Sequence, residues 1–327
     1  MKIALTGGSG HLGTALMQEI GKRGFTVKAL VRDDKLPFPK DMPVEIVKGD
    51  LLELGSVKKL VAGCDVLIHS AAFISVNGDR NGLVYKTNVE GTKAVIDTAA
   101  EAGIRRCIHI SSIHAYQQEP SFEILDENRK PVDENSFAYD RSKYAGQQIA
   151  LAANQRGMET IVVNPTSIIG PYDYKPSLMG QVLIDLYKGK LPFVFDGGFD
   201  FCDCRDVANA IINATSMGLP GESYLLGGKW HNFKELVQFL SAASSKKLRV
   251  VTLPEWTGKA GLPFVKLLGI IQNKEPLYTI EALEAIFRGN RSISSEKAKK
   301  ELNYSARPLA ETIRDTFEWF TNKGYLV

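Results

Sequence analysis

The chain has 327 residues, of which 44% are hydrophobic and 24% charged, and its formal net charge is +3. This length suits one large α/β domain or a nucleotide-binding domain with a smaller lobe, and the composition is that of an ordinary globular protein. A charge this small, spread along the chain, argues against a nucleic-acid-binding surface. The chain's 4 cysteines are too few for a disulfide scaffold.

No targeting segment or membrane span is expected. The apolar residues 3–5 meet Gly7, well short of a signal-peptide core. The longest later apolar stretch, residues 260–271, is interrupted by Pro263 and Lys266 and is too short to cross a bilayer. We interpret it as a helix packed in a lobe, with a membrane-contacting or substrate-channel surface as the alternative. The protein is expected to be cytoplasmic.

Short apolar runs alternate with amphipathic stretches along the first half of the chain. Strands are predicted at residues 2–6, 26–31, 44–48, 66–69, 106–110 and 160–164. Helices are predicted at residues 11–23, 56–61 (with Ser56 as its cap), 86–102 and 139–156. Near-continuous apolar strands that alternate with helices are typical of a parallel sheet covered on both faces. The predicted fold class is therefore α/β, with a doubly wound parallel (Rossmann) sheet.

Beyond Pro165 the alternation loosens, and only a helix at residues 206–217 and a strand at 224–226 stand out. We predict a Rossmann domain over residues 1–166, to which segments around 201–227 return. Residues 167–327 are expected to form mainly a smaller, substrate-binding lobe.

Cys202 and Cys204 are two residues apart, so on one strand their side chains would point the same way. A metal pair is the alternative, but no further Cys/His cluster accompanies them. We expect reduced cysteines and no metal site.

A glycine-rich turn directly joins the first strand to the first helix. Its residues are Thr6-Gly7-Gly8-Ser9-Gly10-His11-Leu12-Gly13. Glycines permit a tight turn and let backbone amides approach a pyrophosphate, at which the helix N-terminus also points. This position favours a dinucleotide-binding loop, with Gly7, Gly10, His11, Leu12 and Gly13 against the cofactor, over a plain glycine-rich turn.

The residues after the second and third strands predict which dinucleotide is bound. Arg32 comes first after the second strand, and its planar guanidinium suits the 2′-phosphate of NADP. The alternative is that Asp33 takes the ribose of NAD and Arg32 faces solvent. Asp50 and Leu51 follow the third strand, where a carboxylate can accept from the adenine amino group; a turn-capping Asp50 is the alternative. We favour NADP, with NAD as the less favoured cofactor.

Tyr139 and Lys143 are four residues apart at the start of a predicted helix, so both project from one face. A phenol has an ordinary pKa of about 10, and an ammonium group within roughly 4–6 Å lowers it. The pair is therefore predicted to exchange a proton with a substrate oxygen.

Ser111 and Ser112 end the fifth strand, where strand C-termini line the ligand crevice of such a sheet. We choose Ser112 as the hydroxyl that stabilises a developing alkoxide, and Ser111 for a supporting contact. The alternative is that both serines simply end a strand.

These motifs resemble those of extended short-chain dehydrogenases/reductases, and within them the dihydroflavonol-reductase-like branch. The resemblance covers essentially the whole chain. Its motifs are TGGSGHLG (6–13), VRDD (31–34), GDLLE (49–53), HSAA (69–72), TNVEGT (87–92), ISSIHAY (110–116), YDRSK (139–143), NPTSIIGP (164–171) and CDCRDVANA (202–210).

The resemblance implies roles for residues that spacing alone does not assign. It makes Ser112, Tyr139 and Lys143 a catalytic triad, with Lys143 also on the nicotinamide ribose. It places Ala71 and Ala72 beside the cofactor and gives Asn88 a supporting role. Along the nicotinamide it places Pro165, Thr166, Ser167 and Ile168.

Two departures bear on the subtype. Sugar-nucleotide dehydratases of this superfamily usually carry an Asp-Glu pair where this chain has Ile113-His114. Many epimerases carry an arginine at the position of Phe199, which weakens the epimerase interpretation. His114 is interpreted as a satisfied or solvent-facing loop residue, with an extra acid as the alternative.

The predicted reaction is the reduction of a ketone or aldehyde by NADPH, or the reverse oxidation of an alcohol. The alternatives are a sugar-nucleotide epimerase and a non-catalytic NADP-binding redox sensor. The expected partner is a small carbonyl or alcohol, with no nucleic acid and no membrane, and the protein is expected to be a monomer or a homodimer. Candidates for an apolar substrate pocket, for which ordinary packing is the alternative, are Phe73, Ile74, Tyr172, Tyr174, Phe193 and Phe195.

Overall fold

The main sheet of the computed structural model has seven parallel strands in the order β10-β6-β5-β4-β1-β2-β3. The structure describes residues 1–32, 44–258, 260–261 and 279–326. The strands are β1 (Lys2–Thr6), β2 (Thr26–Val31), β3 (Val44–Lys48), β4 (Val66–His69), β5 (Arg106–Ile110), β6 (Glu159–Pro165) and β10 (Ser223–Leu226). The predicted fold class, a doubly wound Rossmann sheet, is confirmed.

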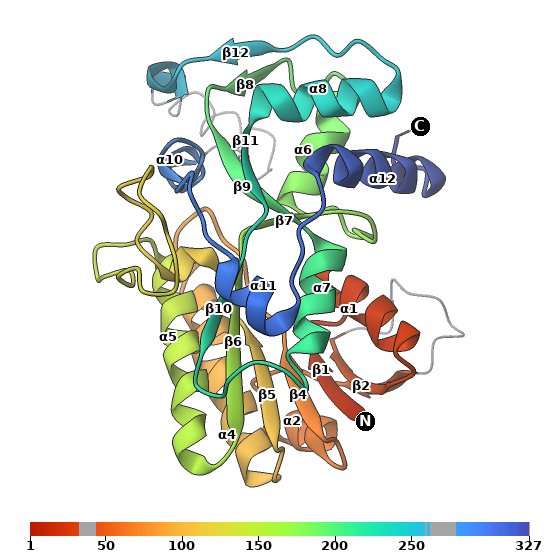
Figure 1. The fold of residues 1–327 in the computed structure, drawn as a ribbon, viewed down its shortest axis with the longest axis vertical. Coiled ribbons are helices and arrows are strands. Elements are labelled where there is room, and N and C mark those ends of the chain that lie inside the picture. The colour runs from red at the N-terminus through yellow and green to blue at the C-terminus, as the bar shows by residue number, and fades with distance from the viewer. Residues whose placement is uncertain (33–43, 259, 262–278, 327) are drawn as a thin grey trace.

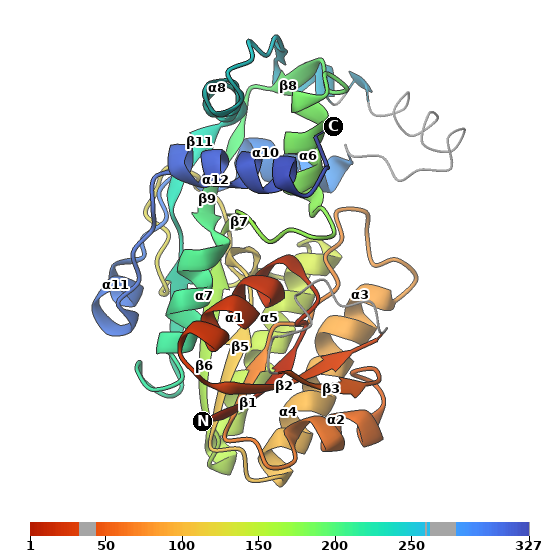
Figure 2. The same cartoon turned by 90° about the vertical axis from the view of Figure 1, so that its right-hand side faces the viewer.

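Helices cover both faces of this sheet (Figures 1 and 2). On one face lie α1 (His11–Lys22) and α7 (Cys204–Asn213), and on the other α2 (Leu54–Val61), α4 (Thr92–Glu101) and α5 (Ala138–Ala152). Successive strand side chains point to opposite faces, so Ile3 and Leu5 of β1 enter one apolar core and Ala4 enters the other. The sheet is buried on both sides for this reason.

Several predicted helix boundaries are corrected. The stretch predicted as one helix at 86–102 begins with α3 (Leu83–Tyr85) and passes through a π-helical turn, Lys86–Gly91, before α4. Ser56 is not the cap of α2, because it lies inside the helix and donates to Glu53 Oε2 at 2.6 Å. The helix predicted at 206–217 is α7, which begins at Cys204 because Asp203 accepts from the Arg205 backbone N–H.

The two cysteines predicted on one strand are separated by a strand end. Cys202 lies on β9 (Gly198–Asp203), whereas Cys204 is the first residue of α7. Both are buried free thiols. Their side chains therefore do not share a strand face.

A smaller lobe lies over the carboxyl ends of the main strands (Figure 1). Its sheet consists of β7 (Ser167–Ile169), β9 and β11 (Lys229–Asn232), and β8 (Phe193–Phe195) pairs with β12 (Val251–Leu253). Its helices are α6 (Leu178–Tyr187), α8 (Phe233–Ser244), α10 (Ile280–Arg288) and α12 (Leu309–Asn322). Because β7 starts two residues after β6 ends, the chain passes directly from one part to the other. The late helix α11 (Glu296–Leu302) packs against β10 of the main sheet.

The apolar stretch at 260–271 lies almost entirely outside the described residues. Among the helices that are described, none has the length and apolar character needed to cross a membrane.

Candidate active site

One cavity of about 1070 Å³ extends from the glycine-rich turn to the smaller lobe. Most of the predicted site residues line it, namely Gly7, Gly10, His11, Leu12, Gly13, Ala72, Ser111, Ser112, Tyr139, Lys143, Pro165, Thr166, Ser167 and Ile168. Five predicted residues are not part of its lining: Arg32, Asp50, Leu51, Ala71 and Asn88. The cavity is large enough for a dinucleotide and a small substrate together.

The glycine-rich turn leaves no room for side chains at two positions. Gly7 has φ +74°, and a Cβ there would lie 2.7 Å from Ala71 N. A Cβ on Gly13 would lie 2.0 Å from Gly7 O. The turn therefore packs against the end of β4, and the N-cap of α1 is Gly10, which has no side chain to bind the first amides of the helix. This cradle fits a pyrophosphate.

The residues predicted near the adenosine lie at the ends of β2 and β3. Arg32 is exposed directly after β2, while Asp33 falls outside the described residues. The Asp50 carboxylate accepts from Leu52 N at 3.0 Å, which is the turn-capping contact given as the alternative. Ala71 N donates to Thr6 Oγ1 at 3.2 Å, so its contact in this structure is to the first strand.

Ser112, Tyr139 and Lys143 converge on the cavity from two elements. Ser112 lies two residues after the end of β5, and Tyr139 and Lys143 lie one turn apart on α5. The Ser112 hydroxyl lies close enough to the Tyr139 phenol to lower its pKa. The Lys143 ammonium donates to Ile110 O at 2.8 Å. The parallel sheet therefore brings a hydroxyl, a phenol and an ammonium to one place.

Burial decides the protonation of this group. It raises the pKa of Tyr139 above its ordinary value, and the neighbouring Ser112 hydroxyl opposes this only in part. The expected lowering of that pKa by Lys143 is therefore not observed, because the loss of phenolate hydration raises the pKa by more than the neighbouring groups lower it. Burial also lowers the pKa of Lys143 to about 8. Tyr139 is thus a protonated phenol at neutral pH.

Asn88 and Ser111 support the start of α5. Asn88 Oδ1 accepts from Phe73 N at 2.7 Å, and its Nδ2 donates to Ser142 Oγ at 2.9 Å. Ser142 lies between the tyrosine and the lysine on the same helix. Ser111 Oγ donates to Lys143 O at 3.3 Å. These contacts tie the helix to the ends of β4 and β5.

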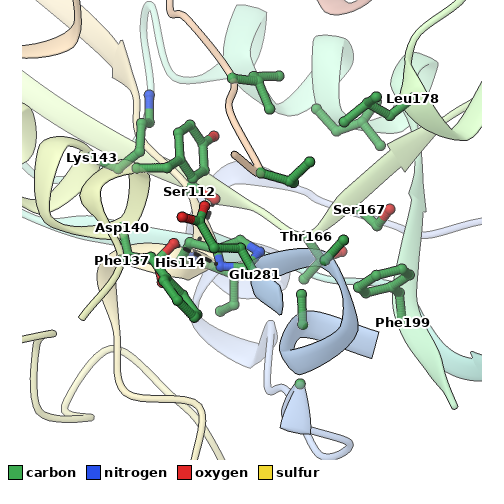
Figure 3. Close-up of a pocket in the computed structure, with 18 of the residues that line it drawn as sticks. Ser112, His114, Phe137, Asp140, Lys143, Thr166, Ser167, Leu178, Phe199 and Glu281 are labelled. Atoms are coloured by element: carbon green, nitrogen blue, oxygen red, sulfur yellow. Dashed lines mark hydrogen bonds and ion pairs between the residues drawn. The ribbon is translucent and has the colours of Figure 1, made fainter. Parts of the chain in front are cut away.

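The lobe side of the cavity is largely apolar, with charged side chains contributed by α10. Figure 3 shows Leu178 and Phe199 on this side, with Thr166 and Ser167 between them and the serine. Met179, Phe233 and Ile286 continue the apolar lining. Of the predicted pocket candidates, Phe73, Ile74 and Phe195 line the cavity, and Tyr172, Tyr174 and Phe193 do not.

Polar residues also line the cavity, among them His114, which the sequence analysis interprets as a satisfied or solvent-facing loop residue, and two carboxylates to which it gives no role. His114 Nδ1 lies 3.1 Å from Asp140 Oδ1, and Figure 3 shows this pair beside Ser112. Glu281 of α10 lies on the same side. The positions of His114 and Asp140 in the sequence could have pointed to this site, because Asp140 directly follows Tyr139 and His114 comes two residues after Ser112.

Comparisons with known proteins agree with this geometry. The family model described as "NAD dependent epimerase/dehydratase family" matches residues 3–227. "Sterol demethylase protein B" of Methylococcus capsulatus is 29% identical over 100% of both chains. "Putative dihydroflavonol 4-reductase" of Synechocystis is 29% identical over 98% of this chain and 95% of that protein.

A solved structure also covers the whole chain. The crystal structure of gox2253 has a TM-score of 0.84 and 29% identity, over 100% of this chain and 99% of that one. The family model, the relatives and the solved structure therefore agree. The chain belongs to the NAD-dependent epimerase/dehydratase family of extended short-chain dehydrogenases/reductases.

Proposed function

We propose that this protein is an NADP(H)-dependent oxidoreductase. Its substrate is an apolar ketone or aldehyde, which it reduces, or the corresponding alcohol, which it oxidises. The observation that carries the proposal is that Ser112, Tyr139 and Lys143 line one cavity, which joins the glycine-rich turn to the smaller lobe. Residues 1–166, with 201–227, would hold the cofactor, and residues 167–327 would supply most of the substrate surface.

The chain's own groups suit the proton half of this reaction. When bound, NADPH supplies a hydride to the carbonyl carbon. Ser112 and Tyr139 hold the carbonyl oxygen by hydrogen bonds, and Tyr139 gives that oxygen its proton as the hydride adds to carbon. A raised pKa keeps the phenol protonated for this step. Lys143, with its pKa lowered to about 8, stabilises the phenolate that remains.

The cofactor preference rests on Arg32. It is exposed at the end of β2, where the 2′-position of an adenosine ribose lies in this fold, and a guanidinium binds phosphate with paired hydrogen bonds. Asp50 and Leu51 would lie along the adenine, and Ala71, Ala72 and Pro165–Ile168 along the rest of the cofactor. We therefore propose NADP over NAD.

The substrate surface favours a carbonyl compound over a nucleotide sugar. Leu178, Phe199 and Phe233 present apolar carbon to the cavity, and Phe199 stands where many epimerases carry an arginine. The relatives named above take their names from a sterol and a dihydroflavonol, both compounds with fused rings. An apolar substrate with a reactive carbonyl fits this lining.

The test is NADPH consumption over a panel of aromatic, aliphatic and steroid-like ketones and aldehydes. Tyr139→Phe should lower turnover by about a hundredfold or more while it leaves NADPH affinity nearly unchanged. Tyr144→Phe is the matched control, because Tyr144 lies on the same helix outside the cavity lining. Retention of most activity by Tyr139→Phe would reject the assigned acid.

Two results would replace the proposal. Turnover of uridine-diphosphate sugars without added cofactor would indicate an epimerase. Tight NADPH binding with no turnover across the panel would indicate a redox sensor.

A further inference from the structure

His114 faces the cavity next to the proposed proton donor. It lies on the short 3₁₀ turn Ile113–Ala115, and its backbone N–H donates to Ser112 Oγ at 3.2 Å. Its ring lies edge-on to the Tyr139 ring, with 6.0 Å between the ring centroids. The side chain is 33% exposed and belongs to the cavity lining. The proposed proton transfer does not involve this imidazole.

Asp140 fixes which ring atom of His114 is available. Nδ1 lies 3.1 Å from Asp140 Oδ1, so this carboxylate occupies one end of the imidazole (Figure 3). Within the part of the chain that the structure describes, Nε2 has no hydrogen-bond partner. Asp140 and Tyr139 are neighbours on α5, so the helix that carries the proton donor also orients the histidine. Nε2 is therefore left for a ligand in the cavity.

We propose that His114 Nε2 donates a hydrogen bond to a second, uncharged oxygen of the substrate, next to the carbonyl held by Ser112 and Tyr139. This rests on the proposed function and narrows its substrate class to ketones with a neighbouring carbonyl or hydroxyl oxygen. An imidazole beside the reacting carbonyl can reach such an oxygen, whereas a plain ketone would leave it unpaired.

The charges around His114 favour an uncharged oxygen over a carboxylate. Asp140 on α5 and Glu281 on α10 both line this side of the cavity, and Glu281 Oε1 accepts from Gly78 N at 2.8 Å. A third carboxylate here would meet two others. Burial lowers the pKa of His114, but the charge and hydrogen bond of Asp140 more than reverse this, so the net shift is upward. A raised pKa increases the share of the imidazolium form, in which Nε2 carries a proton and donates.

The experiment compares two ketones that differ in one oxygen. The ratio of kcat/KM for 1-phenyl-1,2-propanedione to that for 1-phenyl-2-propanone is measured with NADPH for the wild type and for variants. The intrinsic reactivities of the two ketones cancel when ratios are compared between proteins. His114→Leu should lower the ratio of kcat/KM values about tenfold or more. Asp140→Asn should lower this ratio too.

The matched control is His231→Leu. His231 Nδ1 lies 3.2 Å from Glu235 Oε2, so it forms the same kind of pair outside the cavity lining, and the ratio should stay at the wild-type value. Circular dichroism of each variant confirms the fold.

Three results would overturn the inference. An equal loss of kcat/KM for both ketones in His114→Leu would mean that this residue only positions Ser112. A preference for phenylpyruvate that His114→Leu abolishes would mean that the site binds a carboxylate. If the wild type consumed no NADPH with any carbonyl compound of the panel, the proposed function itself would fail, and the inference with it.

Discussion

Two buried histidines lie close enough to the proposed catalytic lysine to sense its charge. His69 on β4 and His109 on β5 have ring centroids 5.3 Å apart. His69 Nδ1 lies 2.7 Å from Thr6 Oγ1 and its Nε2 3.0 Å from Thr92 Oγ1, whereas His109 has no hydrogen-bond partner among the described residues. Burial, with a smaller contribution from the Lys143 charge, lowers the pKa of His69 to about 3. Burial also lowers the pKa of His109 well below its ordinary value.

These histidines predict a loss of stability in mild acid. In the unfolded chain each titrates at a pKa of about 6.5, so below that pH the unfolded state binds protons that the native state does not. The contribution of these two histidines to the free energy of unfolding should therefore be level above about pH 6.5. Below it, the two histidines lower that free energy by up to about 1.4 kcal/mol per pH unit each.

The measurement is urea denaturation between pH 8 and 4.5 for the wild type and for His109→Phe. The variant should show a shallower fall, because one of the two groups no longer titrates. The carboxylates titrate in both proteins and cancel in the comparison. Parallel curves for the two proteins would contradict the prediction.

At the scale of an element, helix α1 contains two glycines, Gly13 and Gly21, and the turn that leads into the helix has no room for a side chain at Gly13. A Cβ on Gly13 would lie 2.0 Å from Gly7 O, which is backbone and cannot yield without moving the turn. Gly21, one residue before the end of the same helix, has nothing within 4 Å of its Cβ position. The same substitution should therefore have opposite effects at the two positions.

Gly13→Ala should weaken NADPH binding at least about tenfold, because the amides of the turn move away from the pyrophosphate. Gly21→Ala should leave binding unchanged and raise the free energy of unfolding by roughly 0.5–1 kcal/mol, the usual gain from alanine in a helix. Fluorescence titration and thermal unfolding measure the two quantities. Equal NADPH affinity in both variants would remove the pyrophosphate assignment from this turn.

At the scale of the whole molecule, the cavity lies where the main sheet meets the smaller lobe, so a ligand bound there contacts both. A ligand that binds the folded protein alone stabilises it by about 2.7 kcal/mol at a hundred times its Kd. This corresponds to a shift of several degrees in Tm. Cofactor binding should therefore be visible as thermal stabilisation of the whole chain.

At equal concentration, NADPH should raise Tm more than NADH does. Arg32→Ala should reduce the NADPH shift to that of NADH, because the two cofactors differ only at the 2′-phosphate. Thermal unfolding of both proteins with each cofactor makes the comparison. An equal loss for both cofactors in Arg32→Ala would remove the argument for NADP.

Local patterns in the sequence determined the sheet and the elements that carry the site. An apolar strand, a glycine turn, and a tyrosine and lysine four residues apart each depend on short-range geometry, which neighbouring residues specify by themselves. Strand ends in a parallel sheet meet at one edge, so the convergence of Ser112, Tyr139 and Lys143 also followed from their order along the chain.

The tertiary structure alone decided what surrounds these groups. The pairing of His114 with Asp140, the place of Glu281 in the cavity and the apolar lining from Leu178 and Phe199 join segments far apart in the sequence. It also reversed the expected direction of the Tyr139 pKa, because desolvation depends on the enclosure that the whole fold creates around a group. No pattern within a short stretch of chain carries that information.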